Sequence, residues 1–533
     1  MRGPFRLVPL SCLALGLVLA GCSELDRQRL RARFGDAEAQ LALARAYASG
    51  SGVEADAAEA ARWYAEADAP DRLEVAKELA ALYAEGGPGL PPDPAQALAW
   101  TQRAADRGDT DAQLDLARRF RDGDGVPADP QQAAKYLRAV AEGGLAEAQY
   151  ELGLLHAQGR GVLIDVGEAA RWYEKAAEQG HAKAQNHLGF LYVVDVGPPR
   201  DYEKAVHWFR KAAAQDQPEA VLNLGRMIEQ GYGVERDPAE ALRWIRRAAE
   251  MGLPEAEFQL ALRPPEGADP DGHFAEWARR AAESGHGVAA RRLAEQASDP
   301  AEALRWYRQG AEAGDAPSRY ELADRLADGV GAEADPEEAF DWMRMAAIQG
   351  YLPAVNKLGI FYAHAIGTES DPAEASVWYE RAAQQGSPEG ALNLGLAYAR
   401  GQVGGTEDFD AALSWVQRAA DAGLADAQLA LGLWRRQGLG GEPDPEAAFA
   451  LIEQAAKQGH AVALAQLGTH YEQGIGTPVD RTRAYAAYAM AADAGETSAV
   501  SARARVGGRL TAAERRRSAE LIRQWREETA SDE

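Results

Sequence analysis

The sequence predicts an all-α fold, an α-solenoid superhelix of about thirteen antiparallel helix hairpins with a C-terminal capping helix. Three observations predict it. Trp172, Trp208 and Trp244 are each 36 residues apart, and steps of 36 or 37 continue along most of the chain. Each step contains two stretches with helical periodicity, and an Asp-Pro-x-Glu phrase often precedes the second. Units of this length cannot bury their own apolar faces, so they stack on their neighbours.

The aromatic spacing extends in both directions from these three tryptophans. The only irregular steps lie around Trp277. The equivalent positions are Trp63, Trp100, Tyr136, Trp277, Trp306, Trp342, Trp378, Trp415, Leu451 and Ala487.

Residues 1–21 are predicted to be a lipoprotein signal peptide. A basic start precedes the apolar run 7–20, which is shorter than an ordinary membrane span. Leu19-Ala20-Gly21-Cys22 resembles a bacterial lipobox, which predicts cleavage before Cys22 and lipidation of its thiol. The alternatives are a plain secretory signal and an uncleaved membrane helix. Ser23 replaces the aspartate that, in similar lipoproteins, favours the inner membrane, so we expect the periplasmic face of the outer membrane.

Residues 22–36 are predicted to be the lipidated N-terminus and a short basic lead-in to the first hairpin. The segment contains Arg27, Arg29, Arg31 and Arg33. These arginines could hold the base of the array near anionic lipid headgroups, or they could simply be solvated on an exposed helix.

Residues 37–262 are predicted to form the first block of hairpins. In the first helix of a hairpin, helix A, apolar residues such as Ala184, Leu188 and Leu191 recur at helical spacing. Glycines in 231–233 can end helix A with positive φ. Asp237-Pro238-Ala239-Glu240 then begins helix B, with aspartate as N-cap, proline at N1 and glutamate near the positive helix end.

These phrases resemble the Sel1-like repeat, a relative of the tetratricopeptide repeat with a longer hairpin. The resemblance covers roughly residues 37–502. It implies a right-handed superhelix of antiparallel helix pairs that serves as a scaffold for other proteins. An alginate-secretion lipoprotein is one relative with a similar plan, a lipobox followed by helical repeats and a C-terminal helix.

Two rows of positions are predicted to lie in the core. The aromatic row shares a face of helix B with alanines, so we expect it to be buried. Glycines such as Gly225 recur inside helix A, where glycine is unfavourable, which predicts a close helix crossing. We expect Gly225→Leu to force neighbouring hairpins apart.

The regular spacing breaks once, at residues 263–272, a Pro-rich segment that cannot continue a helix. We interpret it as a local change of curvature or a weak hinge. Residues 273–502 are predicted to form the second block of repeats, and residues 503–533 the capping helix and tail. A capping box at 511–514 and a stripe of Ala513, Leu521, Ile522 and Trp525 support this last helix.

Composition excludes several classes of function. A net charge of −25 and a pI near 4.9 argue against nucleic-acid partners. The acidity either selects basic partners or is a solvated surface. Of the two cysteines, Cys12 lies in the signal and Cys22 would be acylated, so no thiol remains for a disulfide or metal.

The sequence contains no phosphate-binding loop, nucleophile elbow or His-Glu-x-x-His motif, so we assign no catalytic residue, metal or cofactor. We therefore predict a non-enzymatic periplasmic scaffold for envelope or secretion proteins, including polysaccharide secretion. The alternative is an envelope hydrolase or cell-wall glycan binder. Variable helix-A positions are expected to line the concave face and bind partners, or to be merely solvated. They are Gln40, Asp115, Glu151, His187, Asn223, Asn356 and Asn393.

Overall fold

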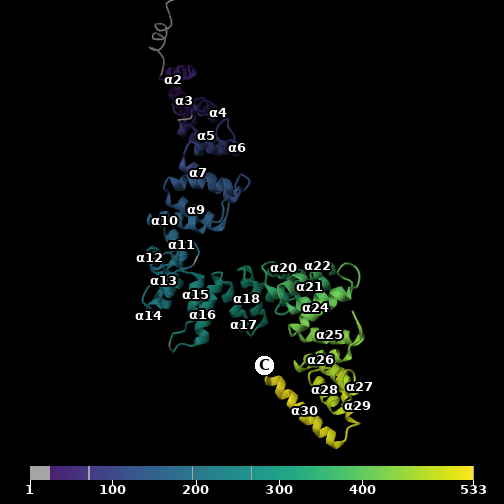
Figure 1. The fold of residues 1–533 in the computed structure, drawn as a ribbon. Coiled ribbons are helices and arrows are strands. Elements are labelled where there is room, and N and C mark those ends of the chain that lie inside the picture. Colours follow the sequence, from purple (N-terminus) through teal and green to yellow (C-terminus); the bar gives the residue numbers. More distant parts are fainter. Residues whose placement is uncertain (1–23, 70–71, 195, 266, 532–533) are drawn as a thin grey trace, which may run out of the picture. The chain divides into compact units, whose positions relative to one another are not determined.

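The computed structural model describes residues 24–69, 72–194, 196–265 and 267–531 (Figure 1). These residues form 29 helices and no strand, which confirms the predicted all-α class. The chain divides into two units, Met1–Leu253 and Pro254–Glu533. Among the described residues, no helix combines the length and apolar character needed to cross a bilayer. The predicted signal peptide and Cys22 lie outside the described residues.

The described residues of the first unit form thirteen helices. After α2, odd-numbered helices correspond to helix A and even-numbered ones to helix B. Their bounds are α2 (Glu24–Arg33), α3 (Ala37–Ser49), α4 (Ala57–Ala67), α5 (Leu73–Glu85), α6 (Pro94–Asp106), α7 (Thr110–Asp122), α8 (Pro130–Glu142), α9 (Ala146–Gln158), α10 (Val166–Glu178), α11 (Ala182–Val193), α12 (Tyr202–Ala213), α13 (Pro218–Gln230) and α14 (Pro238–Glu250).

The second unit continues the alternation and ends with the longest helix. Its helices are α15 (Pro254–Ala261), α16 (Pro270–Glu283), α17 (Gly287–Gln296), α18 (Pro300–Glu312), α19 (Ala316–Asp328), α20 (Pro336–Ile348), α21 (Leu352–His364), α22 (Pro372–Gln384), α23 (Pro388–Ala399), α24 (Phe409–Asp421), α25 (Ala425–Gln437), α26 (Pro445–Lys457), α27 (Ala461–Gln473), α28 (Arg481–Asp493), α29 (Thr497–Gly507) and α30 (Ala512–Ser531). Helix α16 begins at Pro270, so the last residues of the Pro-rich segment are helical.

Within each unit, helices pack in chain order. Helix A of a hairpin packs on its own helix B, and that helix B packs on the next helix A. The core therefore runs along the stack as the repeats predicted.

The aromatic row lies in this core, as predicted. Every position from Trp63 to Ala487 is buried or half-buried. Several of the rings also contact a cation one turn later: the Lys175 ammonium lies 3.8 Å from the Trp172 ring, and the Arg381 guanidinium 4.4 Å from the Trp378 ring. These cations cover the outer side of the indoles while their charges remain at the surface.

The glycine row marks a close helix crossing, as predicted, but the crossing lies inside each hairpin. A Cβ atom on Gly225 would lie 3.2 Å from the Ala241 carbonyl oxygen and from side-chain atoms of Trp244 and Ile245, all on α14. The expectation that Gly225→Leu separates neighbouring hairpins is therefore wrong. The added side chain would push helix A away from its own helix B. The residue that faces Gly225 at the crossing is Ile245, which follows Trp244 on the helix B of the same hairpin.

In many hairpins, a glycine in the loop between helix A and helix B contacts the preceding hairpin. A Cβ on Gly367 would overlap the carbonyl oxygen of Pro336, the first residue of α20. The same approach of a glycine to the first residue of the preceding helix B recurs along both units. The pairs are Gly161 with Pro130, Gly197 with Val166, Gly233 with Tyr202, Gly331 with Pro300, and Gly476 with Pro445.

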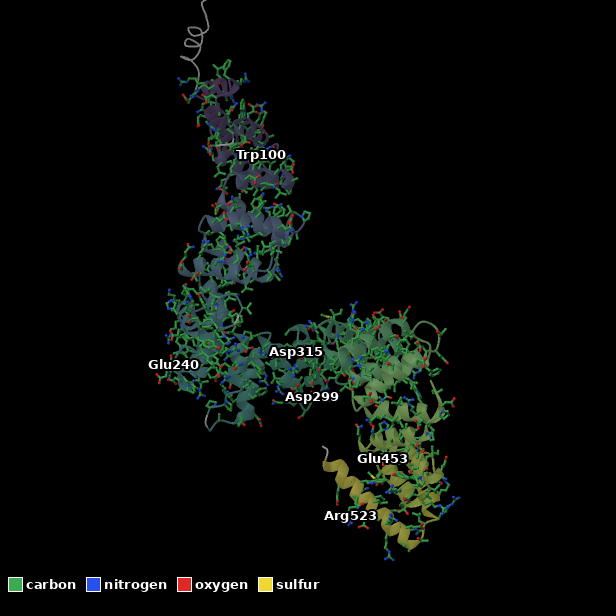
Figure 2. All side chains as sticks on the ribbon, in the orientation of Figure 1. Trp100, Glu240, Asp299, Asp315, Glu453 and Arg523 are labelled. Carbon is green, nitrogen blue, oxygen red and sulfur yellow. The ribbon has the colours of Figure 1, made fainter. Side chains whose placement is uncertain are left out.

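The Asp-Pro-x-Glu phrase caps helix B and also fixes its tryptophan. The Asp237 carboxylate accepts hydrogen bonds from the backbone N–H groups of Ala239 and Glu240, both at 2.9 Å. The Glu240 carboxylate, labelled in Figure 2, accepts the indole N–H of Trp244 at 3.1 Å. The equivalent bond joins Glu374 to Trp378 at 3.0 Å. A capping residue thus orients the core residue one turn later.

Helix α30 packs on α28 and reaches α26, so it covers helix-B surfaces. The predicted capping box is confirmed, because the Thr511 N–H donates to the Glu514 carboxylate at 2.7 Å. Leu521, Ile522 and Trp525 are half-buried, whereas Ala513 is exposed and the predicted stripe is wrong there. Ser518 takes its place: it is buried, and its hydroxyl donates to the Thr482 carbonyl oxygen at 3.1 Å.

Candidate functional site

Asn356 and Asn393, two of the predicted binding residues, are brought together on helices α21 and α23. The Asn393 amide N–H donates to the side-chain oxygen of Asn356 at 3.0 Å. Both side chains are half-buried. Within the described residues, the amide N–H₂ of Asn356 and the amide oxygen of Asn393 have no further partner. The pair therefore presents both donors and an acceptor, which is the combination that an extended peptide backbone requires.

This pair adjoins a cleft of about 320 Å³ formed by α19, α21 and α23. Tyr320, Asn356 and Lys357 line one part of it, and Ser387 and Glu389 at the start of α23 line the other. The Lys357 ammonium lies 2.8 Å from the Asp324 carboxylate. Burial opposes the lysine charge, but the bond to Asp324 outweighs this effect and raises the pKa of Lys357. The cleft thus combines a fixed cation with neutral polar groups.

A second asparagine pair lies in the first unit. The Asn223 amide donates to the side-chain oxygen of Asn186 at 3.0 Å. Asn223 was predicted to bind partners, whereas Asn186 was missed. The two asparagines of each pair are 37 residues apart, one more than the usual repeat length. When the repeats are aligned, the two asparagines therefore occupy different repeat positions.

The remaining predicted residues are not gathered into one site. Gln40 is buried, and its amide donates to the Ala32 carbonyl oxygen at 3.1 Å. Asp115 pairs with Arg119 at 2.8 Å, one turn along the same helix.

Glu151 and His187 are half-buried in the first unit. Burial raises the pKa of Glu151, and Arg121, 3.6 Å away, offsets only part of the shift. The His187 ring lies against Tyr150 and Tyr173, with ring centroids 5.5 and 5.4 Å away. These contacts are mainly structural.

Buried glutamines form a polar joint between repeats, which sequence reasoning missed. The Gln185 amide donates to the Ala177 carbonyl oxygen near the end of the preceding helix B at 2.9 Å. Its own oxygen accepts from Gln215 at 2.9 Å. Gln149 with Gln179 and Gln428 with Gln458 repeat this arrangement. The signal was the recurrent Ala-x-Ala-Gln phrase at the start of helix A.

Gln185→Glu is expected to destabilise the first unit by about 2 kcal/mol at neutral pH, because a carboxylate cannot donate to the buried Ala177 carbonyl. The loss should shrink at pH 4.5, where the carboxyl group can be protonated. Urea unfolding at both pH values checks this. Gln215→Glu, at the exposed end of the same network, serves as the control; an equal, pH-independent loss in both variants would contradict the joint.

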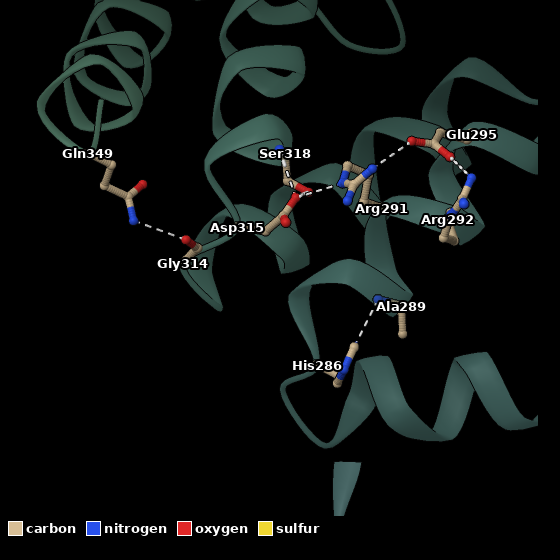
Figure 3. Close-up of polar contacts among 9 residues, drawn as sticks. All are labelled: His286, Ala289, Arg291, Arg292, Glu295, Gly314, Asp315, Ser318 and Gln349. Carbon is tan, nitrogen blue, oxygen red and sulfur yellow. Dashed lines mark hydrogen bonds and ion pairs between the residues drawn. The ribbon is translucent and has the colours of Figure 1, made fainter. Parts of the chain in front are cut away.

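Histidines cap three of the helix-A starts. The His286 Nδ1 accepts the Ala289 N–H at 3.0 Å (Figure 3). Its Nε2 lies 3.1 Å from the Glu255 carboxylate. His181 and His460 repeat this geometry with Glu147 and Asp426. Figure 3 also shows Arg291 held by Asp315 and Glu295. The regular positions of these histidines are thus explained by capping.

His470 is buried in α27, with its Nδ1 2.9 Å from the Ile475 carbonyl oxygen. Burial lowers the pKa of His470 below its ordinary 6.5, and the bond to Ile475 offsets part of this. As pH falls below 6.5, the unfolded chain binds a proton that the folded chain does not. Stability should therefore fall by at most about 1.4 kcal/mol per pH unit through this group.

His470→Gln, which keeps a donor for the Ile475 carbonyl, should reduce this acid sensitivity. Urea unfolding of both proteins at pH 7.5 and 5.5 measures the difference. An unchanged pH dependence in the variant would show that His470 does not titrate differently on folding.

No cluster of three or more His, Cys, Asp or Glu side chains that could hold a metal occurs in the part of the chain that the structure describes. The geometry instead offers repeated polar pairs and shallow clefts along the stack, which are suited to binding other macromolecules.

Comparison with known proteins supports the repeat assignment. The Sel1 repeat model matches thirteen segments, which are 37–67, 75–109, 110–145, 146–181, 182–217, 218–253, 254–286, 291–315, 316–351, 352–387, 388–424, 425–460 and 461–496. None of the curated proteins compared matches the chain.

Solved structures give similar matches. A protective antigen of uropathogenic Escherichia coli with an SLR fold is 27% identical, with 96% of each chain covered and a TM-score of 0.36. A Sel1 repeat protein from Oxalobacter formigenes is 29% identical, with 70% of this chain and 90% of that chain covered and a TM-score of 0.31.

The family matches, taken together, span most of residues 37–496 and coincide with the helix pairs α3–α28. Proteins of this family mediate protein–protein interactions. The chain therefore belongs to the Sel1 repeat family.

Proposed function

We propose that this protein is a lipid-anchored scaffold on the periplasmic face of a bacterial outer membrane. It holds envelope or secretion proteins together. In the more specific form of this proposal, these proteins belong to a polysaccharide-secretion complex of the alginate type. The lipobox-like 19–22 segment supports the anchor, and the family supports protein partners.

The hydrogen-bonded pair Asn356–Asn393 beside the cleft is the observation that carries the binding role. Its free amide groups can bond to the backbone of an extended partner segment, and the Lys357–Asp324 pair adds charges of both signs at the edge. The stacked hairpins hold these groups on packed helices, so binding orders little of the scaffold itself.

Cross-linking pull-down from solubilised envelopes tests the binding role. Asn356→Leu with Asn393→Leu should lose defined membrane or secretion proteins that the wild type captures. The matched control is Gln384→Leu with Gln385→Leu, two exposed amides at the C-terminal end of α22. Equal capture by both variants would contradict a role for the cleft, and hydrolysis of purified wall material by the protein would favour an envelope hydrolase.

The anchor needs its own experiment. Cys22→Ala should abolish incorporation of labelled fatty acid and release the protein from the membrane fraction. Retention of the label in this variant would rule out lipidation at Cys22.

A further inference from the structure

Helices α12 and α14 carry a basic surface on a protein whose net charge is −25. His207, Arg210 and Lys211 on α12, and Arg243 and Arg246 on α14, are all exposed. His207 and Arg243 occupy equivalent repeat positions, 36 residues apart, and so do Arg210 and Arg246. We call these five residues the basic B patch, since all of them lie on helices B of consecutive hairpins in the first unit.

The arginines of the basic B patch are not neutralised by this chain. Arg210, Arg243 and Arg246 make no ion pair with any residue that the structure describes. The neighbouring Arg247 behaves differently, because its guanidinium lies 2.5 Å from the Asp216 carboxylate. Asp216 adopts a φ of 56°, in a turn where other hairpins have glycine. Arg247 therefore has an internal partner, whereas the three patch arginines keep their full charge for an external one.

A groove of about 450 Å³ runs along α12 beside the patch. Its wall extends from Glu203 to Ala214, and Gly233 of the following loop closes one side. Buried Val206 lines it together with three residues of the patch, His207, Arg210 and Lys211. The Lys211 ammonium also lies 4.6 Å from the Trp208 ring, which keeps that side chain close to the helix. The groove can thus hold an anionic side chain rather than only meeting it on a flat surface.

Carboxylates border the patch and limit what can bind. Glu174 on α10 occupies the position equivalent to Arg210, Glu203 lies at the groove, and Glu250 ends α14. A long polyanion or an anionic bilayer would meet these carboxylates and the repulsion of a chain with net charge −25. A short acidic segment can lie along the cations and avoid Glu174 and Glu250. Guanidinium groups also pair with carboxylates through two parallel hydrogen bonds.

We propose that the basic B patch binds an acidic segment of a partner protein, on helices other than those of the Asn356 cleft. Helices α12 and α14 both pack on α13, so the patch cations lie on consecutive hairpins of one unit. An extended segment advances about 3.3 Å per residue, so carboxylates spaced along it can reach the cations of both helices. The segment is therefore an extended one that carries several Asp or Glu residues.

Fluorescence anisotropy with a labelled peptide of five Glu-Gly-Gly units tests the proposal on the full chain. Arg243→Glu with Arg246→Glu should weaken binding by about tenfold or more, and added salt should weaken binding to the wild type. The matched control is Arg516→Glu with Arg517→Glu, an equal change of charge at two exposed residues of α30. An equal loss in both variants would overturn the proposal, because only net charge would then matter.

Two further measurements make the result decisive. The unfolding temperature of the Arg243→Glu/Arg246→Glu variant should match that of the wild type, since neither arginine has an ion pair to lose. The conservative variant Arg243→Lys with Arg246→Lys should keep most of the affinity for the peptide. Tighter binding of phosphatidylglycerol vesicles than of the peptide, lost in the Arg243/Arg246 variant, would overturn the assignment to a protein partner. Failure of the Asn356 experiment would leave this one unaffected, because the two sites share no residue.

Discussion

Gly367→Ala is expected to destabilise the second unit by about 3 kcal/mol or more. Two costs combine. Gly367 has a φ of 67°, where an alanine Cβ is strained by about 1–2 kcal/mol. That Cβ would also overlap the Pro336 carbonyl oxygen and lie 2.9 Å from the Phe340 Cβ. Relieving the overlap requires moving a loop away from a backbone group, which overpacking studies place at about 1–3 kcal/mol.

Gly350→Ala separates these two costs. Gly350 has a φ of 85°, but no atom lies within 4 Å of the position of its Cβ. Its substitution should therefore show backbone strain alone, about 1–2 kcal/mol. Urea unfolding of both variants, with intrinsic tryptophan fluorescence as the signal, measures the difference. Similar losses would mean that the contact between Gly367 and Pro336 is not tight in solution.

Gly225→Leu is expected to cost about 3 kcal/mol in the first unit. The Cβ alone would sit 3.2 Å from the Ala241 carbonyl oxygen, and the rest of the leucine would extend into Trp244 and Ile245. Helices α13 and α14 would have to separate, which exposes the buried Ile245 and Ala248. Losses of this size are typical of overpacked helix crossings.

Two variants show whether size is the cause. Gly225→Ala should cost much less, because alanine occupies the equivalent position as Ala44, Ala117 and Ala323 in other hairpins. Ile245→Ala combined with Gly225→Leu should recover part of the loss by making room at the crossing. Additive losses in the double variant would contradict this account.

Much of the fold could be predicted because its signals are local and repeated. The Asp237 cap, the Trp244 core position and the loop glycines all act within a few residues of themselves, and each recurs in many hairpins. The glycine row showed that another helix crosses helix A closely, but it did not show which helix, and the partner was therefore misassigned. In the structure, Ile245 lies opposite Gly225 and Tyr379 lies opposite Gly359.

The site was less predictable. Variation among helix-A residues drew attention to Asn356 and Asn393, but their pairing could not be foreseen, because residues 37 apart do not align in the repeat register. Gln40 belongs to the recurrent Ala-x-Ala-Gln position instead, where its amide donates to a buried backbone carbonyl. The net charge of the chain did not indicate the basic B patch, because the cations on α12 and α14 are outnumbered by carboxylates elsewhere.

The recurring contact of a loop glycine with the preceding helix B makes these joints interchangeable. Gly197 meets Val166 and Gly233 meets Tyr202, each at the first residue of a helix B. Excising residues 182–217 would bring Gly233 to Val166 through the same backbone surfaces. Genes for such proteins can therefore grow or shrink by whole modules without inventing a new junction, so the number of hairpins can follow the size of the assembly that a lineage has to span.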